Sequence, residues 1–274
     1  MENKLSIDPL LVRKILVEFI RTEITRAGFS RAVINLSGGI DSAVSFILAV
    51  EALGSQNILA IRLPYKTSSP DSLEHAGMLI DQAGCPSRTI PITEMVDSII
   101  NREPGMSEIR KGNLMARTRM MIAYDQSESF KGLVVGTGNK TEILLGYTTL
   151  FGDSACALNP IGDLYKTQLR QLAPTLGIPE QIIAKPPSAD LWAGQTDEGE
   201  LGFTYEEVDK LLFLLVDERY RPEECVEAGF ADKFVRQVCD RIRKNQFKRI
   251  LPPIAKLSNR TVGYDFLYLR DWGT

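Results

Sequence analysis

Histidine is almost absent from this sequence of 274 residues, which contains only His75. Histidine is the commonest general base near neutral pH, so we expect any chemistry here to depend on carboxylates, lysines and metal. His75 itself occurs in a polar helical pattern that is typical of a solvated face. Cysteine is also scarce. The four cysteines include no C-x-x-C pair, which argues against a zinc site or a disulfide framework and favours reduced thiols: Cys85, Cys156, Cys225 and Cys239.

Long apolar runs and an excess of basic residues are also missing. No stretch approaches the roughly 18 apolar residues of a membrane span, and the N-terminus lacks the apolar core of a signal peptide. The formal net charge of −3 gives no basic signature of a nucleic-acid partner. With 44% hydrophobic and 24% charged residues, the composition is that of a globular protein. We therefore expect one cytoplasmic domain over residues 1–274, with neither a membrane nor a nucleic acid as partner.

Residues 31–42 are the most informative stretch of the chain. An apolar strand pattern over residues 32–36 is followed by Ser37-Gly-Gly-Ile-Asp-Ser42, and an apolar helical pattern begins directly afterwards. Glycines let backbone N–H groups approach an anion closely, and a helix N-terminus adds partial positive charge. Asp41 would contact a phosphate only through a cation, which makes it a candidate Mg²⁺ ligand. An ordinary strand-to-helix turn is the alternative, but the complete string favours a phosphate-binding loop.

The string matches neither G-x-x-x-x-G-K-[ST] nor G-x-G-x-x-G, so P-loop kinases and dinucleotide-binding dehydrogenases are disfavoured. It resembles the pyrophosphate loop of the ATP pyrophosphatases, which cleave ATP between its α and β phosphates and adenylate a substrate.

Strand and helix patterns alternate along the rest of the chain. Strands are predicted over 58–64, 88–92 and 132–137, and helices over 8–27, 43–53, 72–83, 93–101, 107–128, 164–176, 204–216 and 231–245. Polar loops over 65–72 and 185–202 separate some of these elements and are candidates for binding loops or lids. The alternation predicts an α/β fold, a doubly wound parallel sheet with flanking helices.

Several charged residues follow predicted strands or begin helices. Arg62 ends the second strand, where ligands of open α/β sheets bind, although a surface arginine is an equally simple interpretation. Glu142 lies one helical turn beyond Gly138 and could reach the same cavity as Asp41. Lys166 falls in the first turn of a predicted helix, which the helix dipole disfavours unless phosphates lie nearby. Asp163 is the predicted cap of that helix.

The landmarks together resemble the synthetase core of the NAD synthetases, within the adenine nucleotide alpha-hydrolase group of Rossmann-like folds. The resemblance covers essentially the full length and has no room for a glutaminase domain. It rests on Ser37–Ser42, Arg62-Leu-Pro, Gly136-Thr-Gly-Asn-Lys-Thr-Glu142, Gly152-Asp153, Asn159-Pro-Ile-Gly-Asp-Leu-Tyr-Lys166, Lys185-Pro-Pro-Ser-Ala-Asp-Leu191 and Lys248-Arg-Ile-Leu-Pro252.

The resemblance implies that the nicotinate carboxylate of deamido-NAD attacks the α-phosphate of ATP, and that ammonia then displaces AMP from the acyl-adenylate to give NAD. It implies ATP contacts at Asn35, Leu36, Ser37, Gly38, Gly39, Ile40, Asp41, Ser42, Arg62, Thr137, Lys166 and Ser188. Asp41 and Glu142 would hold Mg²⁺, Asp153 would lie near ammonia, and Arg117 and Lys248 would bind deamido-NAD. Family members are homodimers with that substrate at the subunit interface.

The chain departs from the family pattern on the side of the acyl acceptor. Leu150, Ala157 and Phe247 stand where many relatives have a lysine, an aspartate and a histidine. Two other functions therefore stay open. One is an ATP pyrophosphatase that adenylates another carboxylate or a tRNA base. Pyrophosphatases that modify tRNA or insert sulfur usually need a basic surface or a nucleophilic cysteine pair, and Cys156 is the only candidate thiol here. The other is a non-catalytic adenylate-binding module, which would not need carboxylates directed at a metal.

Overall fold

The computed structural model describes residues 4–188, 190–192 and 195–266. Its centre is a four-stranded sheet in the order β3-β2-β1-β4, and every neighbouring pair of strands is parallel. The strands are β1 (Ala32–Asn35), β2 (Ile58–Arg62), β3 (Ser87–Thr89) and β4 (Leu133–Val134). The expected parallel α/β sheet is thus confirmed, although β3 and β4 are shorter than their sequence patterns predict.

Both faces of the sheet are covered, as expected for a doubly wound fold. Ala32 and Ile34 of β1 belong to one apolar cluster, formed with helices α1 (Pro9–Arg26), α2 (Ile40–Leu53) and α7 (Lys166–Leu172). Val33, between them, belongs to a second cluster on the opposite face with α4 (Thr93–Ile100) and α5 (Glu108–Phe130). Alternate residues of a strand point to opposite faces. The continuous apolar run of β1 is therefore the pattern of a strand buried on both sides.

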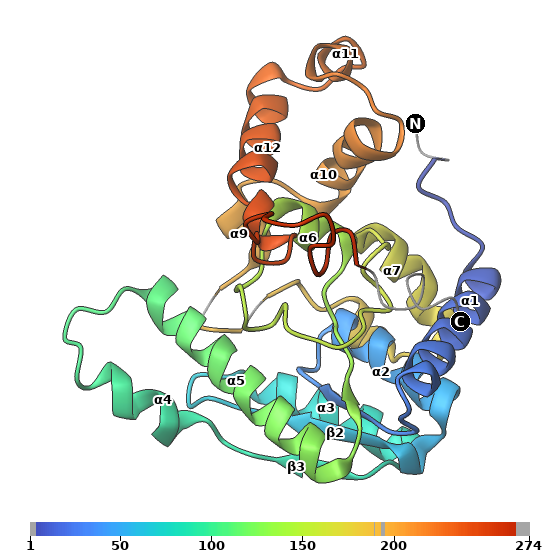
Figure 1. Ribbon diagram of the computed structural model, residues 1–274, viewed down its shortest axis with the longest axis vertical. Coiled ribbons are helices and arrows are strands. Elements are labelled where there is room, and N and C mark those ends of the chain that lie inside the picture. The colour runs from blue at the N-terminus through green and yellow to red at the C-terminus, as the bar shows by residue number, and fades with distance from the viewer. Residues whose placement is uncertain (1–3, 189, 193–194, 267–274) are drawn as a thin grey trace.

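A separate group of helices lies above the sheet in Figure 1. It consists of α10 (Tyr205–Leu212), a π-helical turn (Phe213–Asp217), α11 (Pro222–Glu227) and α12 (Asp232–Lys244), which pack through their own apolar cluster. Leu145 of α6 (Lys140–Leu145) belongs to the same cluster. Because α6 follows β4 closely, this contact joins the upper helices to the edge of the sheet where the strands end.

Most of the remaining elements add buried side chains to the cluster around β1 or to that of the upper helices. These remaining elements are α3 (Pro70–Ala83), α8 (Glu180–Ile183), α9 (Asp197–Leu201) and 3-10 turns at Ser55–Asn57, Ala173–Leu176 and Gln246–Lys248. The expected loop over 185–202 is correspondingly interrupted, since its last part forms α9. Residues 189, 193 and 194 of that loop lie outside the described residues. The prediction that Asp163 caps a helix was wrong, because α7 begins later and its N-cap is Tyr165.

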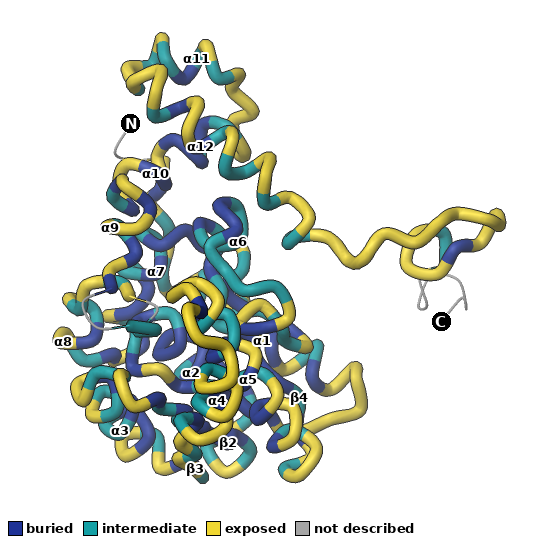
Figure 2. The backbone as a smooth tube through the Cα atoms, turned by 90° about the vertical axis from the view of Figure 1, so that its left-hand side faces the viewer, coloured by how far each residue is buried: buried dark blue, intermediate teal, exposed yellow. Residues whose placement is uncertain are grey.

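The chain leaves the body after α12. Figure 2 shows that the segment following this helix runs outward as an extended and largely exposed arm. Its apolar side chains include Leu251, Leu257 and Val262, which are 77%, 94% and 66% exposed. Among the described residues, no helix is long and apolar enough to cross a membrane.

Candidate functional site

A cavity of about 750 Å³ opens where the strands of the sheet end. Its wall includes Asn35 at the end of β1, Arg62 at the end of β2 and the N-terminus of α2. Ligands of open parallel sheets bind outside the carboxyl ends of the strands. The volume lies within the range of roughly 300–1,000 Å³ that is typical of small-molecule sites.

The loop between β1 and α2 is cross-linked by hydrogen bonds from its own serines. The Ser42 hydroxyl donates to the Gly39 carbonyl at 3.0 Å, and it lies 3.0 Å from the Ser37 hydroxyl. Helix α2 begins after Gly39, which has no side chain to cap it. Because the first-turn N–H groups of a helix have no intrahelical acceptor, this end of α2 offers donors and a positive partial charge to an anion in the cavity.

Gly38 has a conformational role in this loop. Its φ of +77° lies in the left-handed region, and a Cβ atom added there would lie 2.2 Å from the Ser72 carbonyl oxygen. The backbone of the loop therefore packs directly against the start of α3. Gly38 does not line the cavity, whereas the other predicted loop residues, 35–37 and 39–42, do.

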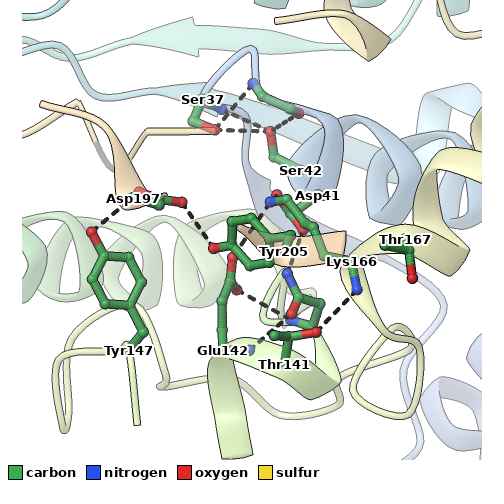
Figure 3. A network of polar contacts seen from close by, with 12 residues as sticks. Ser37, Asp41, Ser42, Thr141, Glu142, Tyr147, Lys166, Thr167, Asp197 and Tyr205 are labelled. Carbon is green, nitrogen blue, oxygen red and sulfur yellow. Dashed lines mark hydrogen bonds and ion pairs between the residues drawn. The ribbon is translucent and has the colours of Figure 1, made fainter. Parts of the chain in front are cut away.

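Two carboxylates and one lysine converge beside the loop (Figure 3). The Lys166 ammonium lies 2.5 Å from Asp41 Oδ2 and 3.6 Å from Glu142 Oε1. Asn139 caps α6 by accepting from the Glu142 N–H, and its Nδ2 donates to Asp41 Oδ1 at 2.8 Å. Three separate segments, at α2, α6 and α7, thus place these groups together, as the sequence predicts for Asp41 and Glu142.

The electrostatics of this cluster favour an additional cation. Burial and the nearby charge of Asp41 raise the pKa of Glu142 to about 8, although Lys166 acts in the opposite direction. Burial alone would lower the pKa of Lys166, but Asp41 and Glu142 outweigh it and the net shift is upward. This pKa keeps Glu142 largely protonated near pH 7 in the absence of a metal, and a bound cation would favour its ionised form, in which two negative charges face Lys166. Hard carboxylate oxygens with a surplus negative charge beside a phosphate-binding loop fit Mg²⁺, which usually binds one or two carboxylates together with substrate phosphates.

A second layer of polar residues supports Lys166. The Tyr205 ring lies under the ammonium at 5.1 Å, and the Tyr205 hydroxyl donates to Asp197 Oδ2 at 3.0 Å. Asp197 also accepts from the Tyr147 hydroxyl at 3.2 Å. Asp197, which is 4% exposed, belongs to α9, so this network ties the 185–202 segment to the charged cluster.

The opposite side of the cavity is built where α6 ends. Side chains from α12 and the turn after it donate to carbonyl groups at the C-terminus of α6, which a helix leaves free, and just beyond it. Arg241 donates to Leu145, and Lys248 donates to Gly146 and Thr148, both at 2.7 Å. The basic end of α12 therefore has a structural function in addition to any contact with ligands.

Asp153 lies in the loop after α6, where it accepts from the Thr149 N–H at 2.8 Å. It also lines the cavity. It is close enough to Lys248 for the two charges to interact.

Most of the predicted site residues surround this one cavity. Arg62, Thr137, Glu142, Asp153, Lys166, Ser188 and Lys248 all contribute to its wall. Arg117 does not. It is exposed, and its Nε donates to the Leu150 carbonyl at 3.3 Å.

Sequence reasoning missed Asn139, Tyr147, Asp197 and Tyr205. The Asn-x-x-Glu spacing of a capping box was a readable signal for Asn139. The other three belong to a tertiary network that no local pattern reveals.

The chain matches the family model described as NAD synthase over residues 12–252. It is 52% identical over 271 residues to the NH3-dependent NAD⁺ synthetase of Trichlorobacter lovleyi, with 99% of each chain covered. It is 53% identical to the enzyme of the same name from Chlorobaculum tepidum, with 98% of each chain covered. This chain belongs to the NAD synthase family.

Solved structures agree with this assignment. The NH3-dependent NAD synthetase of Campylobacter jejuni superposes with a TM-score of 0.78 at 32% identity, over 91% of this chain and all of the other. An NMN synthetase from Francisella tularensis superposes with a TM-score of 0.82 at 31% identity, over 92% of this chain and all of the other. The glutamine-dependent NAD⁺ synthetase of Acinetobacter baumannii gives 0.68 at 26% identity, and 96% of this chain covers 50% of that one.

The three departures from the NAD synthase pattern have different surroundings. The Leu150 backbone accepts from Arg117, while Ala157 and Phe247 are exposed. Cys156 packs against Gly136, where an added Cβ would lie 2.7 Å from its sulfur. Burial raises the pKa of the Cys156 thiol, which disfavours the reactive thiolate.

Proposed function

We propose that this chain catalyses the ATP-dependent amidation of deamido-NAD by ammonia, giving NAD, AMP and pyrophosphate through an acyl-adenylate. The observation that carries the proposal is the cluster of Asp41, Glu142 and Lys166 beside an open phosphate-binding loop. A cluster of this kind suits a reaction whose leaving group is a highly charged diphosphate. The close relatives named NH3-dependent NAD⁺ synthetases support the choice of acceptor and nitrogen donor.

In this proposal ATP occupies the side of the cavity next to the sheet. The N-terminus of α2 and the serines of residues 35–42 would bind the departing pyrophosphate, with Gly38 setting the shape of the loop. Arg62, Thr137 and Ser188 would contact the rest of the nucleotide. Lys166 is held between Asp41 and Glu142 in the resting protein, so its ammonium is fixed beside the loop before ATP binds and would need little reorganisation.

Asp41 and Glu142 would hold Mg²⁺. Bound there, the ion would neutralise the charge that develops on the phosphate oxygens. The protein's own contribution is to keep both carboxylates near the loop, which Asn139 does by bonding Asp41 and capping the helix that bears Glu142.

The other side of the cavity would receive the acyl acceptor and ammonia. Asp153 is a carboxylate in the cavity wall, where it could hold an ammonium ion and accept its proton. Lys248 would bind deamido-NAD through charge, and Arg117 would do so from outside this cavity. The nearly complete coverage of NH3-dependent relatives, compared with half of the glutamine-dependent one, supports free ammonia and a single synthetase domain over residues 1–274.

One assay tests the proposal. Purified protein is given ATP, Mg²⁺, ammonium and deamido-NAD, and NAD, AMP and pyrophosphate are measured. Without ammonium, deamido-NAD should still support exchange of labelled pyrophosphate into ATP, because the first step is reversible. Formation of ADP would contradict adenylation. AMP without NAD would indicate another carboxylate or a tRNA base as acceptor. If neither AMP nor NAD formed, a non-catalytic adenylate-binding module would remain.

A second acceptor belongs in the same assay. The altered residues Leu150, Ala157 and Phe247 all lie on the acceptor side in this proposal, and one structural neighbour is named an NMN synthetase. Nicotinate mononucleotide is therefore the second candidate substrate. If kcat/KM is higher for the mononucleotide than for deamido-NAD, the mononucleotide replaces the dinucleotide as the proposed acceptor.

We also propose a cytoplasmic homodimer. The free cysteines fit a reducing compartment. Large apolar side chains are exposed on α1, where Leu10 and Ile15 are 67% and 55% exposed, and along the arm after α12. Exposed apolar side chains that gather on one element are a common feature of protein interfaces. Light scattering should give the mass of two chains, and truncation after residue 253 should shift the equilibrium toward the monomer.

A further inference from the structure

The cavity wall contains an arginine that the sequence motifs leave without a function. Helix α5 presents residues 109, 112, 113, 116, 119, 120 and 123 to the cavity, a spacing of three and four that defines one helical face. Arg119 is the cation of this face. Arg117, two residues earlier, lies on another side of the helix.

Arg119 is held in place at one end only. Its Nε donates to the Leu63 carbonyl at 3.1 Å, just beyond the end of β2. Within residues 4–188, 190–192 and 195–266, its terminal nitrogens have no hydrogen-bond partner and no carboxylate lies within ion-pair distance. Removal from water lowers the pKa of the guanidinium, and the charges of Asp190 and Asp153 only partly compensate. A planar fork with free N–H groups in a cavity suits a carboxylate or phosphate ligand.

The charges of the cavity separate into two groups. Lys166 interacts with Asp41, Glu142 and Asp197, on the side of the phosphate-binding loop. Arg119 interacts with Asp190 and Asp153, and Asp153 in turn interacts with Lys248. The two carboxylates near Arg119 have donors of their own. Asp190 accepts from the Ser69 N–H and the Ser72 hydroxyl, and Asp153 accepts from the Thr149 N–H. The Arg119 charge therefore interacts with carboxylates on two sides, Asp190 beside the start of α3 and Asp153 in the loop after α6.

We propose that Arg119 binds the carboxylate of the acyl acceptor and thereby distinguishes the acid substrate from its amide product. This inference rests on the proposed function, because it takes ATP to lie on the Lys166 side and ammonia beside Asp153. A carboxylate between the two would be held next to both reactants. Conversion to the uncharged carboxamide removes the charge-assisted bond, which favours release of NAD.

The test compares two ligands that differ only in this group. Dissociation constants for deamido-NAD and NAD are measured by calorimetry without ATP, on the wild type and on Arg119→Met. A hydrogen bond to a charged group is worth about 1.5–3 kcal/mol, so the wild type should prefer deamido-NAD by about tenfold to a hundredfold. In Arg119→Met the affinity for deamido-NAD should fall by that factor while the affinity for NAD stays within about twofold.

Two further variants keep the test decisive. Arg110→Met removes an exposed arginine of the same helix, one that pairs with Glu103, and should leave the preference unchanged. Arg119→Lys keeps the charge but loses the fork, so its preference should lie between those of the wild type and Arg119→Met. Equal weakening of both ligands, or an unchanged preference in Arg119→Met, would refute the inference. Failure of the wild type to bind deamido-NAD while it binds α,β-methylene-ATP would instead refute the proposed function.

Discussion

Replacing Lys166 by methionine should destabilise the metal-free protein and change how its stability depends on pH. Methionine retains most of the apolar stem of lysine but removes the ammonium that lies between Asp41 and Glu142. The side chain of Lys166 is 2% exposed. Methionine cannot pair with the two acidic groups, which then have only their remaining protein donors and the solvent of the cavity as partners.

The magnitude follows from the protonation of Glu142. Its pKa of about 8 means that in the free protein at pH 7 it is largely neutral, so the charged pair that is lost is Asp41 with Lys166. Removing one partner of a buried ion pair costs about 3–5 kcal/mol. The side chain of Asp41 is 19% exposed and keeps its bond from Asn139, which places the expected loss near the lower limit, at about 3 kcal/mol.

The pH dependence separates this explanation from a simple packing defect. A carboxyl group whose pKa is raised on folding retains a proton that the unfolded chain has lost. The free energy of unfolding therefore falls as the pH rises from 4.5, the ordinary pKa of a glutamate, to about 8, the pKa of Glu142 in the folded protein. Above that pH it levels off. Without Lys166 the pKa of Glu142 rises further. The decline, about 1.4 kcal/mol per pH unit, should therefore continue above pH 8 in the variant.

Urea unfolding in EDTA at pH 7, 8 and 9 measures this directly. The difference in unfolding free energy between wild type and Lys166→Met should be about 3 kcal/mol at pH 7 and larger at pH 9. Lys210→Met, in the exposed part of α10, is the matched control and should cost less than about 0.5 kcal/mol at each pH. A difference that stays constant with pH would refute the electrostatic reasoning.

Three other perturbations test separate parts of the structure. Asp153→Asn keeps an acceptor for its backbone partner but loses the charge, so ammonia-dependent kcat should fall about 10²–10⁴-fold, while an unchanged KM for ATP would exclude a damaged nucleotide site. Gly38→Ala combines a positive φ with a contact 2.2 Å from a carbonyl oxygen, so thermal unfolding should occur several degrees lower, and an unaltered midpoint would contradict the close packing of that loop. Hydrogen bonds from Lys66 and Tyr65 lower the pKa of Asp97, so the stabilising effect of this carboxylate is lost as the pH falls toward and below 3.8. Asp97→Asn should weaken this acid dependence when the unfolding free energy is measured against pH. An identical acid transition in the variant would show that these two hydrogen bonds are unimportant for stability.

Local patterns predicted the parts of the site that follow directly from strand ends. The loop after β1 was evident because glycine, serine and aspartate between an apolar strand and an apolar helix leave few alternatives. Glu142 followed from its distance beyond the next buried strand. Lys166 was anticipated as an unfavourable cation at a helix start, but its two carboxylate partners depend on segments more than a hundred residues apart or on the capping of α6. Such pairings have no signature in a single sequence.

The arginines of α5 show where a readable signal was not used. Helical spacing separates Arg117 from Arg119, but only the neighbours at 112, 116 and 123 reveal which face is turned toward the cavity. Glycine and alanine at those positions let the 185–202 segment approach α5 closely, since a Cβ atom added at Gly112 would lie 2.9 Å from the Leu191 side chain. The small residues of α5 therefore mark the face that contacts the 185–202 segment, and Arg119, the arginine on that face, is the one that lines the cavity.

Asn139 explains why the local and the long-range parts of the site are inseparable. As an N-cap, a short side chain with an acceptor oxygen would serve, and serine or aspartate is as favourable as asparagine. Only asparagine among them can accept from the Glu142 N–H and also donate through Nδ2 to Asp41 without adding a negative charge. Aspartate there would place a third carboxylate against two others, and serine would be too short to span the gap. One fully buried side chain thus fixes the start of α6 and the spacing of both acids at once.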